Sequence, residues 1–469
     1  MELKHSKIML ALVAFIILQP VIDVLTTASI LFIDLPLTVG VLIRLAYLGI
    51  MAAWIVYAAT KSKRAKLYLL YLVGFAVLVV VNFVTGMMVK KPFFIVEELT
   101  FYTKAVYFHV LFFGFLLLIE SLAKNGSDTK KQLVNYFLLA SGIISAVFVI
   151  AQLTGTSLAN YARSKEGWTG WFYAGNEIGA AMAILLPITA LYATSKTTSL
   201  KKSVIIHWLP FIFLSLSMLA LGTKVGYGGI LIVLLSIICG SVIMLMWKKK
   251  DEEKKVLKAN ALVSGVLIGA LALTTPFTPV FGNMFAHLDI LGISFKKPPV
   301  EYNALGEEIV VPEDEGPKIT AKELENLVFS SREQYAADYK VQFADAPLIQ
   351  QLFGMGFAGN YDHPEPHKPL KMIEMDFHDW FYAFGILGFL YMMAPIIYFA
   401  VKYVWQFIRN FKETFNYFGI LTGVAFLIGM GISFTAGHVL TAPSVSIYLA
   451  FLFAVLVVVS RDTRLEKRV

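Results

Sequence analysis

Long apolar segments recur along the whole chain and alternate with short polar segments. Each apolar run is about 20 residues long, which is the length that an α-helix needs to cross a hydrocarbon core of about 30 Å. Runs this long and continuous exclude a membrane β-barrel. The pattern predicts an all-α polytopic membrane protein with about 12 transmembrane helices. The predicted spans are residues 8–32, 36–60, 67–89, 100–122, 133–154, 172–195, 204–221, 225–247, 258–275, 377–401, 415–436 and 442–460.

One long polar segment, residues 276–376, interrupts this pattern between the ninth and tenth spans. The chain therefore divides into residues 1–275 with nine spans, the polar segment, and residues 377–469 with three spans. Residues 296–318 of the polar segment are rich in Pro, Gly and acidic residues, and they predict an extended loop whose role the sequence does not define.

The second half of the polar segment has a helical pattern. Thr320 and Glu323 form a capping-box pattern, and apolar residues follow at near-helical spacing. We expect a helix over residues 321–345 that ends before Pro347. Arg332 lies on this helix, away from its apolar stripe.

Composition and charge agree with a membrane protein. The chain is 58% hydrophobic and 15% charged, whereas soluble domains are nearer half apolar and a quarter charged. Most of the 40 Lys and Arg residues fall in alternate segments between spans, such as residues 61–66 and 248–258. The positive-inside rule places these segments and both termini in the cytoplasm, and the polar segment outside. The net charge of +8 thus reflects topology rather than nucleic-acid binding.

The first span and the single cysteine add little to the candidate chemistry. Residues 8–32 lack a small-residue cleavage site, so we expect an uncleaved first span. Cysteine occurs once, at Cys239, so no intramolecular disulfide can form.

A few basic residues break the charge bias and lie toward the predicted outer face. Arg163 lies on a loop, Lys224 in the turn after the seventh span, and Arg44 and Lys104 within spans. A cation within a span costs about 2.5–3.5 kcal/mol on insertion scales, so it usually faces a cavity or a partner. Together with Arg332, these residues predict a site for a lipid phosphate or pyrophosphate. Snorkelling to headgroups or pairing with nearby glutamates is the alternative for any one of them.

His378 begins the tenth span and is followed by Asp379. A histidine with a carboxylate neighbour can accept a proton near neutral pH, so His378 is the candidate general base. An interfacial histidine bonded to the backbone is the alternative. The sequence has no Walker loop and no Asp-x-Asp or His/Cys ligand cluster, so neither ATP nor a metal is predicted.

These features resemble the O-antigen ligase and polysaccharide polymerase family of bacterial membrane glycosyltransferases. The family pattern has an arginine on a helix, a Leu-Gly-x-Gly turn, and His-Asn at the start of a span that ends in Gly-x-x-Gly. The similar positions here are Arg332, residues 352–356, His378 with Asp379, and residues 385–388.

Two earlier motifs also resemble the family. Its arginine followed by Gly-x-Phe and an asparagine is similar to Arg163, residues 170–172 and Asn176, and its Ser-Arg-Gly turn is similar to residues 222–226. The chain departs from the pattern twice: Lys224 stands where the family has arginine, and Asp379 where it has asparagine. The lysine keeps the charge but loses the bidentate fork of a guanidinium.

The resemblance implies a GT-C-like fold and an integral-membrane glycosyltransferase of the bacterial plasma membrane. It implies transfer of an oligosaccharide from an undecaprenyl-pyrophosphate carrier to a hydroxyl of an acceptor glycan at the outer face, with inversion and with neither metal nor other cofactor. His378 would be the base, with Asp379 beside it. The cations would neutralise the pyrophosphate; they are Arg332, Lys224 and Arg163, with Lys104 and Arg44 as further contacts.

Alternative functions remain open at this point. Polymerase is favoured over ligase, although no motif identifies the acceptor, the sugar, the linkage or the oligomeric state. A twelve-span secondary transporter of a small anionic or sugar solute would have similar halves, and the long polar segment breaks that symmetry. A membrane protein with a purely structural role would leave the outer cations unexplained.

Overall fold

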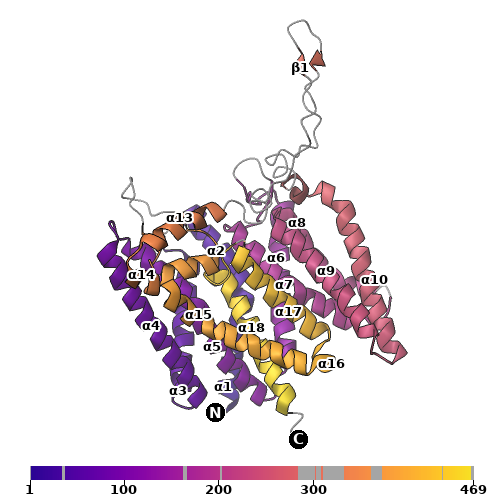
Figure 1. Ribbon diagram of the computed structural model, residues 1–469. Coiled ribbons are helices and arrows are strands. Elements are labelled where there is room, and N and C mark those ends of the chain that lie inside the picture. The colour runs from indigo at the N-terminus through magenta and orange to yellow at the C-terminus, as the bar shows by residue number, and fades with distance from the viewer. Residues whose placement is uncertain are drawn as a thin grey trace.

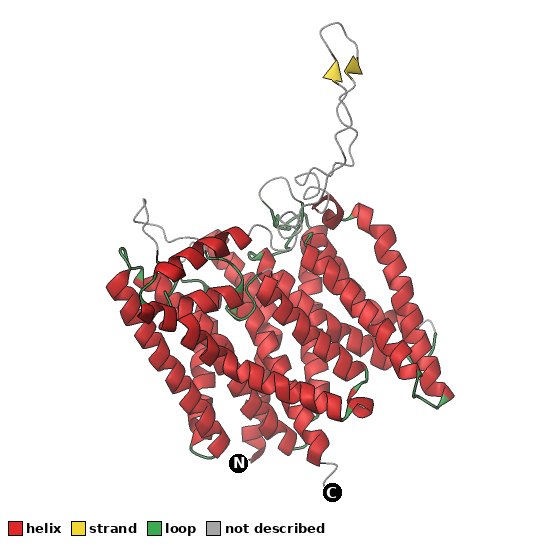
Figure 2. Cartoon of the chain, viewed as in Figure 1, coloured by secondary structure: helices red, strands yellow, loops and turns green. Residues whose placement is uncertain are grey.

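The computed structural model of the protein describes residues 2–33, 37–161, 166–200, 203–283, 301–302, 308–309, 332–360, 372–435 and 437–465. Within these ranges, 12 helical segments are long and apolar enough to cross a membrane. Apart from two strands of two residues each, the described elements are all helical (Figure 2). The all-α polytopic fold is thus confirmed.

The elements follow one another in a simple up-and-down order. The helices before the polar segment are α1 (Glu2–Ala14), η1 (Phe15–Leu18), α2 (Gln19–Ala28), η2 (Ser29–Ile33), α3 (Val39–Ala59), α4 (Lys63–Val89), α5 (Ile95–Lys124), α6 (Thr129–Leu153), α7 (Gly175–Lys196), α8 (Ser203–Leu221), α9 (Lys224–Leu245), α10 (Asp251–Thr274) and η3 (Thr275–Phe277). The later elements are β1 (Glu301–Tyr302), β2 (Glu308–Ile309), α13 (Arg332–Asp345), α14 (Leu348–Phe353), α15 (Asp376–Arg409), α16 (Phe411–Thr414), α17 (Tyr417–Thr435) and α18 (Pro443–Leu465).

Several helices extend beyond the predicted spans because they continue past the apolar run. The ninth span was predicted to begin at residue 258, but α10 begins at Asp251, with acidic residues in its first turn where they suit the helix dipole. The tenth span was predicted to end at residue 401, but α15 runs on to Arg409 over 34 residues. This helix is kinked at Gly385, and it crosses the bundle obliquely (Figure 1).

Helices α5, α7 and α18 form the centre of the bundle and are buried along most of their length. Helix α7 is rich in small residues such as Gly179, Ala180 and Ala183, which allow neighbouring helices to approach closely. Between α5 and α18, the rings of Phe112 and Phe453 stack with centroids 4.7 Å apart. The outer helices instead expose Leu, Val and Ile, as expected of surfaces that contact lipid.

Helices α13 and α14 of the polar segment lie across the end of the bundle opposite the two termini (Figure 1). Helix α13 ends at Asp345, as predicted; residues 321–331 of the predicted helix lie outside the described residues. Residues 296–318 also lie outside them, except for the two short strands. Helix α13 packs on the start of α15 through Tyr339 against Tyr382 and Phe343 against Phe381, with ring centroids 5.8 and 5.3 Å apart.

The predicted glycine turn at residues 354–356 docks directly on a kink in α15. Gly354 and Gly385 both have positive φ, 96° and 68°. A Cβ on Gly354 would lie 2.0 Å from the carbonyl oxygen of Ala383, so only glycine fits this crossing. The backbone N–H groups of Met355 and Gly356 donate to the carbonyls of Tyr382 and Ala383 at 2.9 Å each. The carbonyls of Tyr382 and Ala383, next to the kink, are therefore hydrogen-bonded to the polar segment.

Two side chains from α4 and its following loop complete this junction. Asn82 donates to the carbonyls of Phe353 and Ala383 at 2.5 and 2.7 Å. Lys90, which is buried, pairs with Glu98 at 2.5 Å and donates to the carbonyl of Phe357 at 2.6 Å. Glu98 in turn accepts from the N–H of Phe357 at 2.8 Å. Lys90 is thus a structural cation, and its burial lowers its pKa against the opposing effect of Glu98.

We expect Gly354→Ala to destabilise the protein, because its Cβ would meet the Ala383 carbonyl and because a non-glycine residue at this φ costs about 1–3 kcal/mol. The melting temperature of the detergent-solubilised protein measures this effect. Gly423→Ala is the matched control, since a Cβ there meets nothing within 4 Å. A Gly354→Ala variant that melts with the wild type would contradict the close backbone crossing.

Candidate functional site

A cavity of about 480 Å³ lies between α2, α3, α5 and α7. This volume falls within the range of about 300–1,000 Å³ that is typical of ligand sites. Its polar lining includes Asp23, Arg44, Lys104, Glu177 and Ser444. We call it the larger cavity.

The larger cavity has an exposed, apolar side, which we call its mouth. Its rim includes Leu37, Val41 and Leu45 from α3 and the segment before it, and Val96 and Leu99 from α5. These side chains are exposed, Val96 by 72% and Leu37 by 56%. Exposed apolar side chains on spanning helices are the kind that contact lipid, so we expect the mouth to face the bilayer. A ligand with a long apolar chain can therefore enter it from the bilayer.

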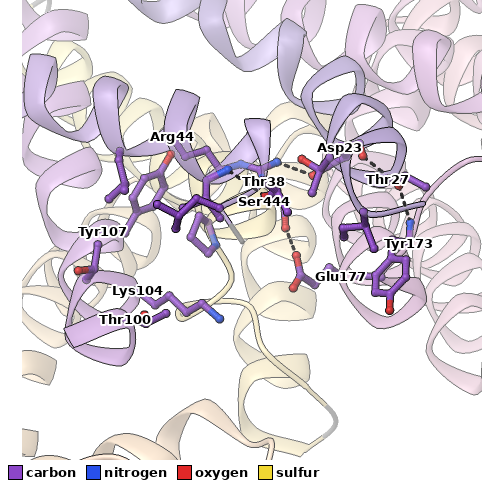
Figure 3. A pocket seen from close by; sticks show the side chains of 18 of the residues that line it. Asp23, Thr27, Thr38, Arg44, Thr100, Lys104, Tyr107, Tyr173, Glu177 and Ser444 are labelled. Atoms are coloured by element: carbon purple, nitrogen blue, oxygen red, sulfur yellow. Dashed lines mark hydrogen bonds and ion pairs between the residues drawn. The ribbon is translucent and has the colours of Figure 1, made fainter. Parts of the chain in front are cut away.

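Arg44 lies inside this cavity and is paired. Its Nη2 lies 2.5 Å from Oδ1 of Asp23, and its Nε donates to Oε1 of Gln19 at 3.2 Å (Figure 3). A buried pair of this kind offsets the cost of placing a cation in a membrane helix. Arg44 therefore contributes a fixed, largely neutralised group to the wall.

Lys104 projects from α5 into the same cavity (Figure 3). None of the described residues forms an ion pair or hydrogen bond with its ammonium group. Glu177 of α7 lines the same space, and its carboxylate accepts a hydrogen bond from Ser444 Oγ (Figure 3). Lys104 is thus the cation of this wall that is most available to an anionic ligand.

A second cavity of about 230 Å³, which we call the smaller cavity, adjoins the larger one. Both are lined by Val96, Thr100, Lys104 and Glu177, so Lys104 stands at their junction. The remaining lining of the smaller cavity comes from α5, from the polar segment and from the loop before α18; it includes Glu97, Phe101, Phe357, Met372, His438 and Thr441.

The buried carboxylate of Asp376, at the start of α15, fixes the loop that carries His438. Oδ2 accepts from the N–H groups of Val439 and Leu440 at 2.6 and 2.7 Å and from Ser433 Oγ at 3.0 Å. Oδ1 accepts from Thr441 Oγ1 at 2.5 Å and lies 3.4 Å from Nδ1 of His438. These donors disperse the charge of a carboxylate that has no contact with water.

Arg332, at the start of α13, lies beside this cluster. Its Nη2 is 3.3 Å from Oε2 of Glu374, whereas its Nε is buried without a hydrogen-bond partner among the described residues. Glu374 has a positive φ of 64°, an uncommon conformation outside glycine that is often found at functional sites. The helix that carries Arg332 is thus linked to the segment that leads into α15.

His378 and Asp379 are adjacent in sequence but point to different environments. Asp379 is buried and accepts from the N–H groups of Ile373 and Met375 at 3.1 and 3.2 Å. Oδ2 of Asp379 also lies 4.0 Å from Nδ1 of His438, so the carboxylate faces His438 rather than His378. The ring of His378 lies 5.7 Å from that of Phe434, and its Nδ1 is buried without a partner among the described residues. His378 lines neither of the two cavities.

Lys224 begins α9, where Thr223 caps the helix through the N–H of Gly226 at 3.1 Å. Asn283 bonds both to the carbonyl of Gly222 at 2.8 Å and to that of Glu166 at 2.6 Å. The α8–α9 turn therefore lies beside the end of the loop that contains Arg163. Arg163 itself lies outside the described residues, and Lys224 lines neither cavity.

The structure brings two of the predicted cations, Arg44 and Lys104, to one cavity, whereas the sequence analysis did not single out Asp376 or His438. The available signal was a histidine in a short loop between two spans, followed closely by Thr441 and Ser444. Hydropathy assigned this loop only as a connection. Its importance appears when the loop is seen to fold back on Asp376.

The 12 candidate spans and the cavity between them define a polytopic α-helical membrane protein with an amphipathic cavity. The chain belongs to the family of O-antigen ligase like membrane proteins, since the family model matches residues 5–462. Comparison with curated proteins gives no match. Family membership supports a role in glycan ligation or polymerisation at a membrane.

We expect Asp376→Asn to destabilise the protein, because an amide N–H₂ would meet backbone N–H groups that now donate to a carboxylate. Each buried donor left without an acceptor costs about 1–3 kcal/mol. The melting temperature and hydrogen exchange of residues 437–442 report the loss. Asp338→Asn on the exposed face of α13 is the control, and a wild-type exchange rate in the Asp376 variant would refute the role of this carboxylate.

Proposed function

We propose that this protein transfers an oligosaccharide from an undecaprenyl-pyrophosphate carrier to a hydroxyl of an acceptor glycan at the outer face of a bacterial plasma membrane. The observation that carries the proposal is the larger cavity, in a member of this family. It combines an apolar mouth on the lipid side with Lys104 and Arg44 inside. A polyprenyl chain fits the mouth, and its pyrophosphate would reach the cations.

The proposed reaction is a displacement at the anomeric carbon. The acceptor oxygen forms a bond to that carbon while the bond to the pyrophosphate oxygen breaks, and the electron pair leaves with the pyrophosphate. Inversion follows from a single in-line step. The acceptor proton passes to a base, for which His378 is the candidate. His378 lies in the first turn of α15, where the polar segment joins the bundle.

The cations have a separate task in this reaction. Negative charge accumulates on the pyrophosphate as it leaves, and fixed positive groups in a site that excludes water stabilise it strongly. Lys104 stands at the junction of both cavities and is our first candidate. Arg44 supports the same wall, and Arg332 is held beside the smaller cavity through Glu374. Lys224 and Arg163 would act from the neighbouring turn and loop.

The orientation follows from charge. Lysine and arginine are concentrated in the segments at the end of the bundle that holds both termini, which favours the cytoplasm for that end. The cavities and the polar segment would then lie at the outer face, where a translocated lipid-linked glycan is present.

Reconstitution of the full-length protein with lipid-linked repeat units tests the function. Gel analysis of the product should show a ladder of chain lengths for a polymerase, which we favour, or a one-step transfer to a second acceptor for a ligase. If neither product forms and the liposomes show counterflow of a solute, the protein is a transporter and the proposal is wrong.

We expect Lys104→Gln to lower kcat/KM for the lipid-linked donor by about ten- to a hundred-fold, the effect of losing one charge-assisted hydrogen bond. Lys258→Gln, on an exposed face of α10, should leave it unchanged. Equal rates for the two variants would remove Lys104 from the site.

We expect His378→Ala to abolish long product while the protein remains folded in the membrane, since loss of a general base costs about 10²–10⁴-fold in rate. Gel analysis of chain length, with a melting curve as the folding control, measures this. Normal chain lengths from that variant would assign the base elsewhere.

A further inference from the structure

A second histidine, His438, is built into the wall of the smaller cavity. It lies in the short loop between α17 and α18, and its side chain is 32% exposed. Its Nδ1 lies 3.0 Å from Thr441 Oγ1, 3.4 Å from Asp376 Oδ1 and 4.0 Å from Asp379 Oδ2. Nδ1 is therefore fully engaged, which leaves Nε2 as the nitrogen available to a ligand.

The loop holds this histidine rigidly. The N–H groups of Val439, Leu440 and Thr441 all donate to Asp376, so the backbone after His438 is fixed to α15. A side chain whose ring orientation and backbone are both fixed loses little further freedom on binding a ligand. The arrangement is thus that of a positioned binding group.

The charged surroundings of His438 favour the imidazolium form. Burial alone would lower its pKa, but the hydrogen bond and charge of Asp376, with the charges of Asp379 and Glu374, raise it to about 9. Lys104, Glu97 and Glu177 also line the cavity, from α5 and α7. His438 is therefore charged at neutral pH and loses its charge as the pH rises through about 9.

The position of His438 relative to Lys104 defines which part of a ligand it meets. Lys104 lines both cavities, whereas His438 lines only the smaller one. A polyprenyl pyrophosphate that enters from the mouth would present its first phosphate near Lys104. Its second phosphate, which carries the glycan, would lie farther along, in the smaller cavity.

We propose that His438 is a second cationic ligand for the pyrophosphate, donating a hydrogen bond from Nε2 to the phosphate that carries the glycan, with Asp376 and Asp379 as the residues that position and charge it. This inference rests on the proposed function, and it assigns His438 a task different from that of His378. It also gives a role to Asp379, which stands where the family pattern has asparagine.

Binding of geranylgeranyl pyrophosphate to the full-length protein in lipid nanodiscs tests the proposal without requiring catalysis. Titration calorimetry from pH 7 to pH 10 should show wild-type affinity falling as the pH rises through about 9, because the imidazolium is lost. His438→Gln should bind about ten- to a hundred-fold more weakly at pH 7, and the fall near pH 9 should be absent. His207→Gln, a half-buried histidine on α8, is the matched control and should match the wild type.

Asp379→Asn provides the second variant. It keeps the side-chain shape and removes one of the two carboxylates beside the imidazole, so the fall in affinity should move to lower pH. Melting curves of each variant confirm that it is folded. Should His438→Gln fail to fold, the shifted pH profile of Asp379→Asn still decides the question.

The outcomes separate the two proposals. Unchanged affinity and pH profile in His438→Gln and Asp379→Asn would overturn the role of His438, even if Lys104→Gln still binds weakly and the proposed function stands. Binding of geranylgeraniol as tight as that of its pyrophosphate would overturn both. Inorganic pyrophosphate that binds as tightly as the lipid would identify a free-phosphate site and reject the lipid-linked donor as its ligand.

Discussion

The carboxylate of Asp376 connects the elements around the candidate site. It is buried at the start of α15, and its hydrogen bonds reach α17 and the loop that leads into α18. A buried charge is tolerated only when donors surround it, so the loop has little freedom to adopt another path. The positions of His438, of the smaller cavity and of the first turn of α15 all follow from this one group.

The need of buried polar groups for hydrogen-bond partners also explains how a polar segment can dock on a membrane bundle. The kink at Gly385 would leave carbonyls of α15 without partners in an environment poor in water. The N–H groups of residues 355 and 356 and the side chain of Asn82 satisfy them. Lys90 and Glu98 do the same for the backbone of Phe357. Polar groups in this region are thus bonded to one another, and this mutual pairing sets the shape of the site.

The membrane spans could be predicted from sequence because lipid permits few alternatives to a helix. Their ends were less predictable: α10 begins with charged residues that hydropathy treats as loop, and α15 continues past Lys402 to Arg409 through further apolar residues. The clustering of Arg44 and Lys104 followed from the cost of a cation in a span. The partners of Asp376 did not, because the fold brings together residues about sixty positions apart. A lone histidine in a connecting loop carries no local signal of such a contact.

The mouth of the larger cavity also determines which concentration of the ligand matters, the one in the membrane or the one in solution. A ligand that arrives between α3 and α5 diffuses in two dimensions, so its supply depends on the number of carrier molecules per unit of membrane area rather than per volume of solution. Dilution of the membrane with other lipid would then slow encounter, whereas dilution of the surrounding water would not. The amount of membrane lipid, rather than the volume of solution, is therefore the variable that sets the rate of encounter.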